Sequence, residues 1–312
     1  MQRRTATIGF VSLVLAAATA CDKSDPVPST DHAKPAAEKA RPLVLSAIPD
    51  QDPEKLNRLY GLLATYLKTA LKVEVEYKPV TDYKAVVTAF RVGDLDLVWF
   101  GGLTGVQARM QVPDALAILQ RDIDESFRSV FIANKASGIK SLADLKGHTF
   151  TFGSESSTSG RLMPQYYLEK AGVSQADFKG PPGFSGSHDK TIELVTAGAF
   201  DAGAVNEQVW NKRLEKHTVD ESKLTVVSIT EPYHDYHWVL NARTTARFGA
   251  DFQQKIVDAF KALTPEKPSD AAILDLFGAK KFIDTTNGNY REIEQIGRSS
   301  GLIISEVPVT QR

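Results

Sequence analysis

The sequence has little of what marks several common protein classes. Its 312 residues include one cysteine, so no disulfide can form within the chain. The 37 basic and 38 acidic side chains nearly cancel to a net charge of -1, which gives no indication of nucleic-acid binding. No set of His, Cys and Asp has the spacing of a metal site. Any anion that the protein binds must therefore be held by local geometry and not by a global positive field.

The first long apolar run is confined to the N-terminus. Arg3 and Arg4 precede "IGFVSLVLAAATA", which is too short to span a bilayer, and this pattern predicts a signal peptide over residues 1–20. Cys21 follows directly, where bacterial lipoprotein precursors carry the cysteine that is lipidated. Ala18 stands where that pattern most often has Leu, so export with cleavage near Cys21 and no lipid is the alternative. We expect a protein of the periplasm or cell envelope, anchored to a membrane through Cys21.

Residues 21–42 differ in composition from the rest of the chain. They are rich in Pro, Ala, Lys and Asp and have almost no large apolar side chains, so they cannot bury enough surface to become ordered. This segment is predicted to be a disordered tether between the N-terminus and a globular body. The length of the chain favours about two domains in that body.

Hydrophobic periodicity in the body predicts alternating strands and helices. The run "PLVLSAIP" is typical of a buried strand, and the next helix has Asp52 as N-cap and Pro53 in its first turn. The runs "KVEVEYKP", "DYKAVVTAFRVG" and "LDLVWFGG" continue as strand, helix and strand. This order implies parallel pairing in an α/β lobe. A second set of strands and helices begins near Phe127, and Trp99, Trp210 and Trp238 are expected to pack in the core.

Residues 153–162, "GSESSTSGRL", place four hydroxyl side chains between an apolar strand and an apolar helix. A helix N-terminus has unpaired N–H groups and about half a positive charge from its dipole. The hydroxyls of Ser156, Ser157, Thr158 and Ser159 would add donors, and Gly160 would let the backbone approach a ligand closely. One cap needs one hydroxyl, so the segment predicts a site for a tetrahedral oxyanion. Capping by a single serine, with the others solvated, is the alternative.

The runs "SLADLKG", "TFTFGSESSTSG" and "FSGSHDKTIELVTAGAFDAGAVN" resemble the phosphate, phosphite and phosphonate substrate-binding proteins of ABC transporters. The resemblance extends from about Leu43 to about Leu263, and "IPDQDPEKLNRLYGLLATYL" and "DLDLVWFGG" resemble the branch of that family suspected of handling selenate. It implies an α/β, two-lobed type II periplasmic binding fold with a hinge. Lobe 1 would comprise 43–126 plus 236–312 and lobe 2 would comprise 127–235. The ligand would lie between the lobes, and the partner would be an ABC permease in the inner membrane.

The segment "SGSHDK" begins a second helix, and the resemblance implies that Ser187 and His188 face the same cleft. Capping by Ser187, with Asp189 in the first turn, is the alternative. Adjacent helical residues point roughly 100° apart, so these three side chains cannot form a catalytic relay with one another. We therefore predict no enzyme activity, no cofactor and no metal.

Two positions depart from the family pattern. Thr104 and Gly105 follow "WFGG" where relatives often have a Ser-Tyr pair, so a hydroxyl contact would fall to Thr104. Asn206 stands where relatives that take phosphite or aminoalkyl phosphonates usually have an aspartate. Selenate and sulfate offer only acceptors, which an amide can meet and a carboxylate cannot. Asn206 therefore favours a fully ionised oxyanion of the selenate type, although Glu207 or Asp189 could supply a missing acceptor.

The contacts from the first lobe are placed by strand order. Sites in α/β folds open at the carboxyl ends of strands, so Gln51 and Thr104 are the expected donors. The predicted function is that of a monomeric solute-binding lipoprotein that delivers a selenate-type oxyanion to its permease. A phosphate-, phosphite- or phosphonate-binding protein of the same fold is the alternative. An oxyanion sensor and an extracytoplasmic phosphoesterase are alternatives of other classes.

Overall fold

The computed structural model describes residues 41–304. The predicted signal peptide, Cys21 and nearly all of the predicted tether lie outside the described residues. Within residues 41–304, no helix is both long enough and apolar enough to cross a membrane.

The first sheet has six strands in the order β11-β4-β10-β3-β1-β2. Their bounds are β1 (Leu43–Ala47), β2 (Val75–Tyr77), β3 (Leu97–Phe100), β4 (Leu116–Arg121), β10 (His237–Leu240) and β11 (Phe282–Asp284). Strand β1 pairs in parallel with β2 and β3, as the order of elements predicts. Strand β10 returns late in the chain and pairs antiparallel with β3 and β4. The sheet therefore joins two distant stretches of sequence.

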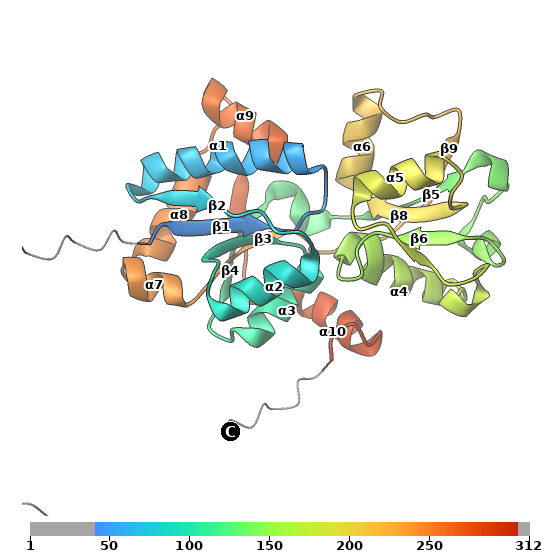
Figure 1. The fold of residues 1–312 in the computed structure, drawn as a ribbon, viewed down its shortest axis with the longest axis horizontal. Coiled ribbons are helices and arrows are strands. Elements are labelled where there is room, and N and C mark those ends of the chain that lie inside the picture. Colours follow the sequence, from blue (N-terminus) through green and yellow to red (C-terminus); the bar gives the residue numbers. More distant parts are fainter. Residues whose placement is uncertain (1–40, 305–312) are drawn as a thin grey trace, which may run out of the picture. The chain divides into compact units, whose positions relative to one another are not determined.

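Seven helices accompany the first sheet, and Figure 1 shows α1 on one face with α2 and α3 on the other. Their bounds are α1 (Pro53–Leu71), α2 (Tyr83–Val92), α3 (Gly102–Gln111), α7 (Arg243–Phe248), α8 (Phe252–Lys261), α9 (Pro268–Phe277) and α10 (Arg291–Ser299). Asp52 caps α1 as predicted, because its carboxylate accepts the N–H of Lys55 at 3.0 Å. The apolar face of α1, which includes Leu59 and Leu63, is buried in the core.

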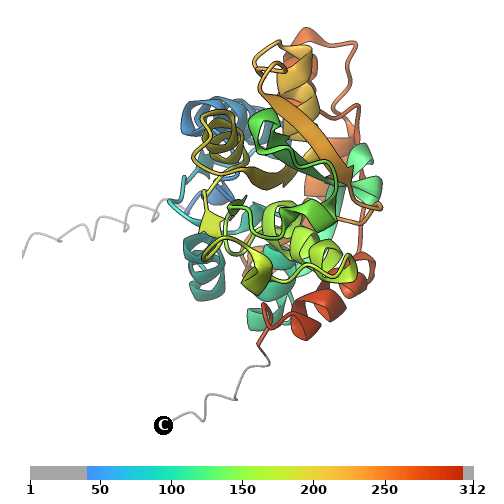
Figure 2. The same ribbon diagram turned by 90° about the vertical axis from the view of Figure 1, so that its right-hand side faces the viewer.

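The second sheet has five strands in the order β7-β6-β8-β5-β9. Its elements are β5 (Ser129–Asn134), β6 (Phe150–Phe152), β7 (Gly183–Phe184), β8 (Ala202–Asn206) and β9 (Leu224–Ile229), with helices α4 (Met163–Lys170), α5 (His188–Thr196) and α6 (Glu207–Glu215). Figures 1 and 2 show α4 and α5 on opposite faces of this sheet. The helix predicted at "SLADLKG" is only a 3-10 turn, Leu142–Leu145, because Asp144 binds the N–H of Ser141 and closes the turn on itself.

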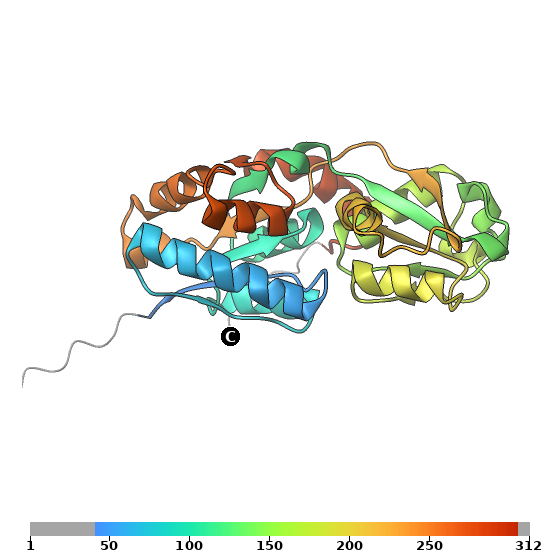
Figure 3. The same cartoon turned by 90° about the horizontal axis from the view of Figure 1, so that it is seen from above.

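Two segments connect the sheets, one after β4 and one before β10, and they run side by side (Figure 3). Phe127 and Tyr233 exchange two backbone hydrogen bonds of 2.9 Å there. Trp99, Trp210 and Trp238 are buried, as predicted. Trp99 also stacks on Tyr236 of the second connecting segment, with ring centroids 5.7 Å apart. The lobe boundaries themselves stay a prediction.

Candidate anion site

The serine-rich segment, residues 153–162, ends in a turn of π-helix, Thr158–Leu162, that continues into α4. Ser157 is the N-cap, and its Oγ accepts the N–H of Gly160 at 2.9 Å. Residues 156–159 are all buried, at 7% exposure or less, so their hydroxyls do not form a solvated loop. Single π turns are frequent at functional sites. Capping accounts for Ser157, and Oγ1 of Thr158 accepts the N–H of Leu103 in α3 at 2.9 Å, but neither contact accounts for the burial of Ser156 and Ser159.

Three buried polar atoms around this segment have no hydrogen-bond partner among the described residues. They are Oη of Tyr83, Nε2 of His188 and Oδ2 of Asp235. Buried atoms in the same condition are also found on Gln120, Gln165 and Trp238, and on Arg161 of the turn itself, whose guanidinium lies 4.2 Å from the centroid of the Phe152 ring. A buried donor or acceptor without a partner costs about 1–3 kcal/mol. Three such atoms close to one helix start indicate a place where a polar ligand supplies the missing partners.

Asp235 lies on the connecting segment before β10 and is 1% exposed. Its Oδ1 accepts the N–H of Gly102 at 2.8 Å, at the start of α3. Burial raises the pKa of this carboxyl to about 7, while the N–H of Gly102 and the nearby hydroxyls of Thr158 and Ser159 oppose the shift. The carboxyl of Asp235 therefore faces the serine-rich segment and can bind or release a proton near neutral pH.

His188 begins α5 and is 1% exposed. Its Nδ1 accepts the backbone N–H of Asn206 at 3.3 Å. Burial lowers the pKa of His188, which favours the neutral ring. A neutral imidazole that accepts at Nδ1 carries its hydrogen on Nε2, so the unpaired Nε2 is a donor. A Cβ on Gly160 would lie 3.1 Å from Cε1 of this ring, so the glycine lets the ring pack on the serine segment.

Tyr83 is the first residue of α2 and is 2% exposed. Burial raises the pKa of its hydroxyl well above the usual value, and Ser157 lies near enough to oppose that shift. The hydroxyl is therefore protonated at neutral pH and can donate. The ring of Tyr83 belongs to the hydrophobic core, and its hydroxyl is the only polar part of the side chain.

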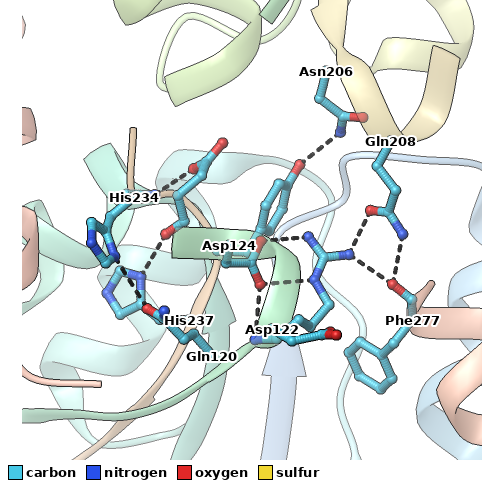
Figure 4. A network of polar contacts seen from close by, with 12 residues as sticks. Gln120, Asp122, Asp124, Asn206, Gln208, His234, His237 and Phe277 are labelled. Carbon is cyan, nitrogen blue, oxygen red and sulfur yellow. Dashed lines mark hydrogen bonds and ion pairs between the residues drawn. The ribbon is translucent and has the colours of Figure 1, made fainter. Parts of the chain in front are cut away.

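A chain of hydrogen bonds lies between the two sheets at the same place. Tyr236 donates to Oδ2 of Asp50 at 2.8 Å. Nδ2 of Asn206 donates to the Tyr236 hydroxyl at 3.1 Å (Figure 4). Oδ1 of Asn206 accepts the N–H of Val209 at 2.6 Å and so caps α6. The amide expected to turn toward the ligand is thus oriented by the helix cap and by Tyr236. The inference from Asn206 to a fully ionised anion loses its basis.

Three other predicted contacts are engaged elsewhere. The hydroxyl of Thr104 donates to the carbonyl of Gly101 at 3.1 Å, within the first turn of α3. Gln51 binds the ammonium group of Lys55 and lines a groove on the outer side of the site. Oγ of Ser187 accepts an N–H in the first turn of α5 at 3.3 Å, so the capping alternative describes it. The structure brings His188 to the serine segment and places these three hydrogen-bonding groups in other roles.

Beneath Tyr236 lies Arg121, the last residue of β4. Its guanidinium is 5.0 Å from the centroid of the Tyr236 ring and forms a 2.7 Å ion pair with Asp124. It also donates at 2.5 Å to Gln208 of α6 and at 2.7 Å to the carbonyl of Phe277, the last residue of α9 (Figure 4). The buried guanidinium of Arg121 thus contacts α6 beside the second sheet, α9 beside the first sheet and the first connecting segment. Among residues 41–304, no group of three or more His, Cys, Asp or Glu could hold a metal ion.

Sequence reasoning missed Asp50, Asp235 and Tyr236 as a group. Asp50 stands next to the expected donor Gln51, and a carboxylate is not a residue type expected beside an anion. Asp235 and Tyr236 form the centre of "PYHDYH", the segment that leads into β10. The available signal was an acidic and an aromatic residue in a segment that crosses between two sheets.

Comparisons with known proteins identify the family of the chain. The family model for the ABC transporter phosphonate periplasmic substrate-binding protein matches residues 45–290. The chain is 49% identical over 271 residues to the probable ABC transporter phosphite-binding protein PhnD1 of Prochlorococcus marinus, covering 85% of this chain and 91% of the relative. It is 29% identical over 222 residues to the phosphate-import protein PhnD of Mycolicibacterium smegmatis, covering 67% and 68%.

Solved structures support the fold. The structure of P. marinus PhnD1 in complex with methylphosphonate matches with a TM-score of 0.82 at 49% identity, over 84% of this chain and 98% of that one. This match confirms the predicted α/β fold of the two-lobed periplasmic binding proteins. The family model covers well over half of the sequence, and a relative that is 49% identical spans 85% of it. The chain therefore belongs to the family of phosphonate substrate-binding proteins of ABC transporters.

Proposed function

We propose that this protein binds a small phosphorus oxyanion that carries one titratable oxygen, of the phosphite or methylphosphonate kind, and delivers it to an ABC permease. Family membership makes the chain a periplasmic substrate-binding protein and not an enzyme. This proposal replaces the predicted selenate specificity with the alternative given by the sequence, a phosphate-, phosphite- or phosphonate-binding protein of the same fold.

The observation that carries the proposal is the unpaired Oδ2 of Asp235 beside Thr158 and Ser159. A fully ionised tetrahedral anion has only acceptors, so a charged carboxylate would repel it. A phosphorus oxyacid can keep one proton near neutral pH and share it with the carboxyl. Asp235 is thus the acceptor that Asn206 lacks, and it supports a phosphorus ligand over selenate or sulfate.

The remaining contacts complete a hydrogen-bonding shell. Tyr83 Oη and His188 Nε2–H are free donors, and the first N–H groups of the Thr158–Leu162 turn point out of the helix start. The hydroxyls of Ser156, Ser157, Thr158 and Ser159 remain proposed ligand contacts. Gln51, Thr104, Ser187 and Asn206 are assigned to supporting roles.

The two PhnD relatives differ in the ligand that their names give, one for phosphite and one for phosphate import. Calorimetric titration of the protein with phosphite, methylphosphonate, phosphate, sulfate and selenate at pH 6, 7 and 8 tests the proposal. The complex should hold one shared proton, so phosphite affinity should be greatest near pH 7 and fall on both sides. Sulfate should bind more weakly and lose affinity above pH 7, where Asp235 ionises. Binding of selenate or sulfate at least as tight as phosphite at pH 8 would overturn it.

A further inference from the structure

A groove of about 490 Å³ lies on the outer side of the anion site, between the start of α1 and the helices α5 and α6. Six cationic side chains line it, namely Lys55, Arg58, Lys190, Lys212, Arg213 and Lys216, against three acidic ones. We call this surface the basic groove. It has a surplus of three positive charges on a protein whose net charge is -1.

Half of these cations have no carboxylate at ion-pair distance among the described residues. Lys190, Lys212 and Arg213 are paired with Glu193, Asp275 and Asp189, respectively. Lys55 binds only the amide oxygen of Gln51, and neither Arg58 nor Lys216 has a side-chain partner in residues 41–304. The surplus charge is therefore exposed to whatever occupies the groove.

The unpaired cations face one another across the groove. Lys55 and Arg58 lie on α1, while Lys216 follows the end of α6. Burial lowers the pKa of Lys55, and the charges of Lys212 and Lys216 lower it further, while the carboxylates of Asp50 and Asp189 oppose the shift. Like charges that approach from different elements repel, and an anion between them relieves that repulsion.

Two hydrogen bonds between the segment before α1 and the first turn of α5 form the floor of the basic groove. We call this contact the seam, and it also covers the anion site. The N–H of His188 donates to the carbonyl of Asp50 at 3.1 Å. The N–H of Asp52 donates to Asp189 at 3.0 Å. Asp50 and His188 face the anion site on one side of these bonds, and their neighbours Gln51, Asp52, Ser187 and Asp189 line the groove on the other. Two hydrogen bonds thus separate the groove from the site.

From this placement we infer that the basic groove is a capture site for small anions, which collects the ligand at the seam before it enters the anion site. The inference rests on the proposed function for the identity of the ligand, a phosphorus oxyanion. A locally positive groove can raise the association rate of an anion even when the net charge is slightly negative, and salt screens the effect. The basic groove would thus supply locally the positive potential that a net charge of -1 cannot supply over the whole protein.

Stopped-flow measurement of phosphite and methylphosphonate association tests this inference, with Trp99 beside Tyr236 as the fluorescent reporter. The variant Arg58→Gln/Lys216→Gln removes two exposed charges that hold no carboxylate. The control Lys140→Gln/Lys179→Gln makes the same change in net charge at exposed positions away from the groove. At low ionic strength the groove variant should associate about 3- to 10-fold more slowly than wild type. Its dissociation rate and the control's association rate should be unchanged.

The difference should vanish at high salt, where the Debye length is about 3 Å. An equal slowing in the control, or a change confined to the dissociation rate, would overturn the inference. If neither phosphorus ligand binds wild type, the proposed function fails separately. Chloride-35 NMR then tests the groove alone: excess line broadening that is lost in the groove variant and kept in the control supports it, and equal broadening in both refutes it.

Discussion

Replacing Asp235 by asparagine should change both the stability and the specificity of the protein. Burial raises the pKa of this carboxyl from 3.8 to about 7 in the unliganded fold. Between these values the folded state binds more protons than the unfolded state, so stability is greatest at low pH and is lost as pH rises toward 7. The loss is about 2 kcal/mol from pH 5 to pH 7 and approaches about 3 kcal/mol by pH 8, where it levels off.

Asp235→Asn removes this titration while keeping the size of the side chain. Urea denaturation of wild type and variant at pH 5 and pH 8 measures the effect, because other titrating groups, including His188, cancel in the difference. The variant should gain about 3 kcal/mol relative to wild type between the two pH values. A difference that stays constant within about 0.5 kcal/mol would refute the assigned pKa.

Asp235→Asn should also shift the ligand preference of the protein from phosphite toward sulfate. An amide NH2 can donate to a fully ionised oxygen but cannot accept a strongly bound proton as a carboxylate does. A hydrogen bond to a charged group contributes about 1.5–3 kcal/mol, so the phosphite-to-sulfate affinity ratio at pH 8 should fall by about 10- to 100-fold. Calorimetry with both ligands measures that ratio. An unchanged ratio would remove Asp235 from the site, whatever the stability result.

Further substitutions test the other contacts. Ser157→Ala should lower the free energy of unfolding by about 1 kcal/mol, measured by urea denaturation, because the helix cap is lost. It should also weaken phosphite binding by about 1–3 kcal/mol, measured by calorimetry. Ser187→Ala should lower the free energy of unfolding by a similar amount and leave phosphite binding unchanged. Tyr83→Phe should weaken binding by about 10-fold without destabilising the unliganded protein, because its hydroxyl has no partner there; a loss of stability above about 1 kcal/mol would contradict this. Gly160→Ala would place a Cβ 3.0 Å from Oγ of Ser157 and should lower affinity with little loss of helix content by circular dichroism; unchanged affinity would show that the His188 ring can give way.

Much of the fold was predictable because its signals are local. The Asp52 cap, Pro53 and the apolar spacing of α1 lie within one helix, and strand–helix–strand order implies the parallel pairing of β1 with β2 and β3. The antiparallel return of β10 into the first sheet has no such signal. It depends on contacts between residues more than a hundred positions apart.

The same distinction between local signals and distant contacts applies to the site. A row of hydroxyls before an apolar helix is a property of consecutive residues, so the sequence alone determined that residues 156–159 form a donor-rich helix start. The roles of Asn206 and Asp235 depend on what surrounds them. Only the tertiary structure decided that the amide of Asn206 caps α6 and contacts Tyr236, while the carboxyl of Asp235 is buried beside the serine segment. Desolvation and partner geometry determine whether a polar group is free for a ligand, and both arise only when distant segments pack together.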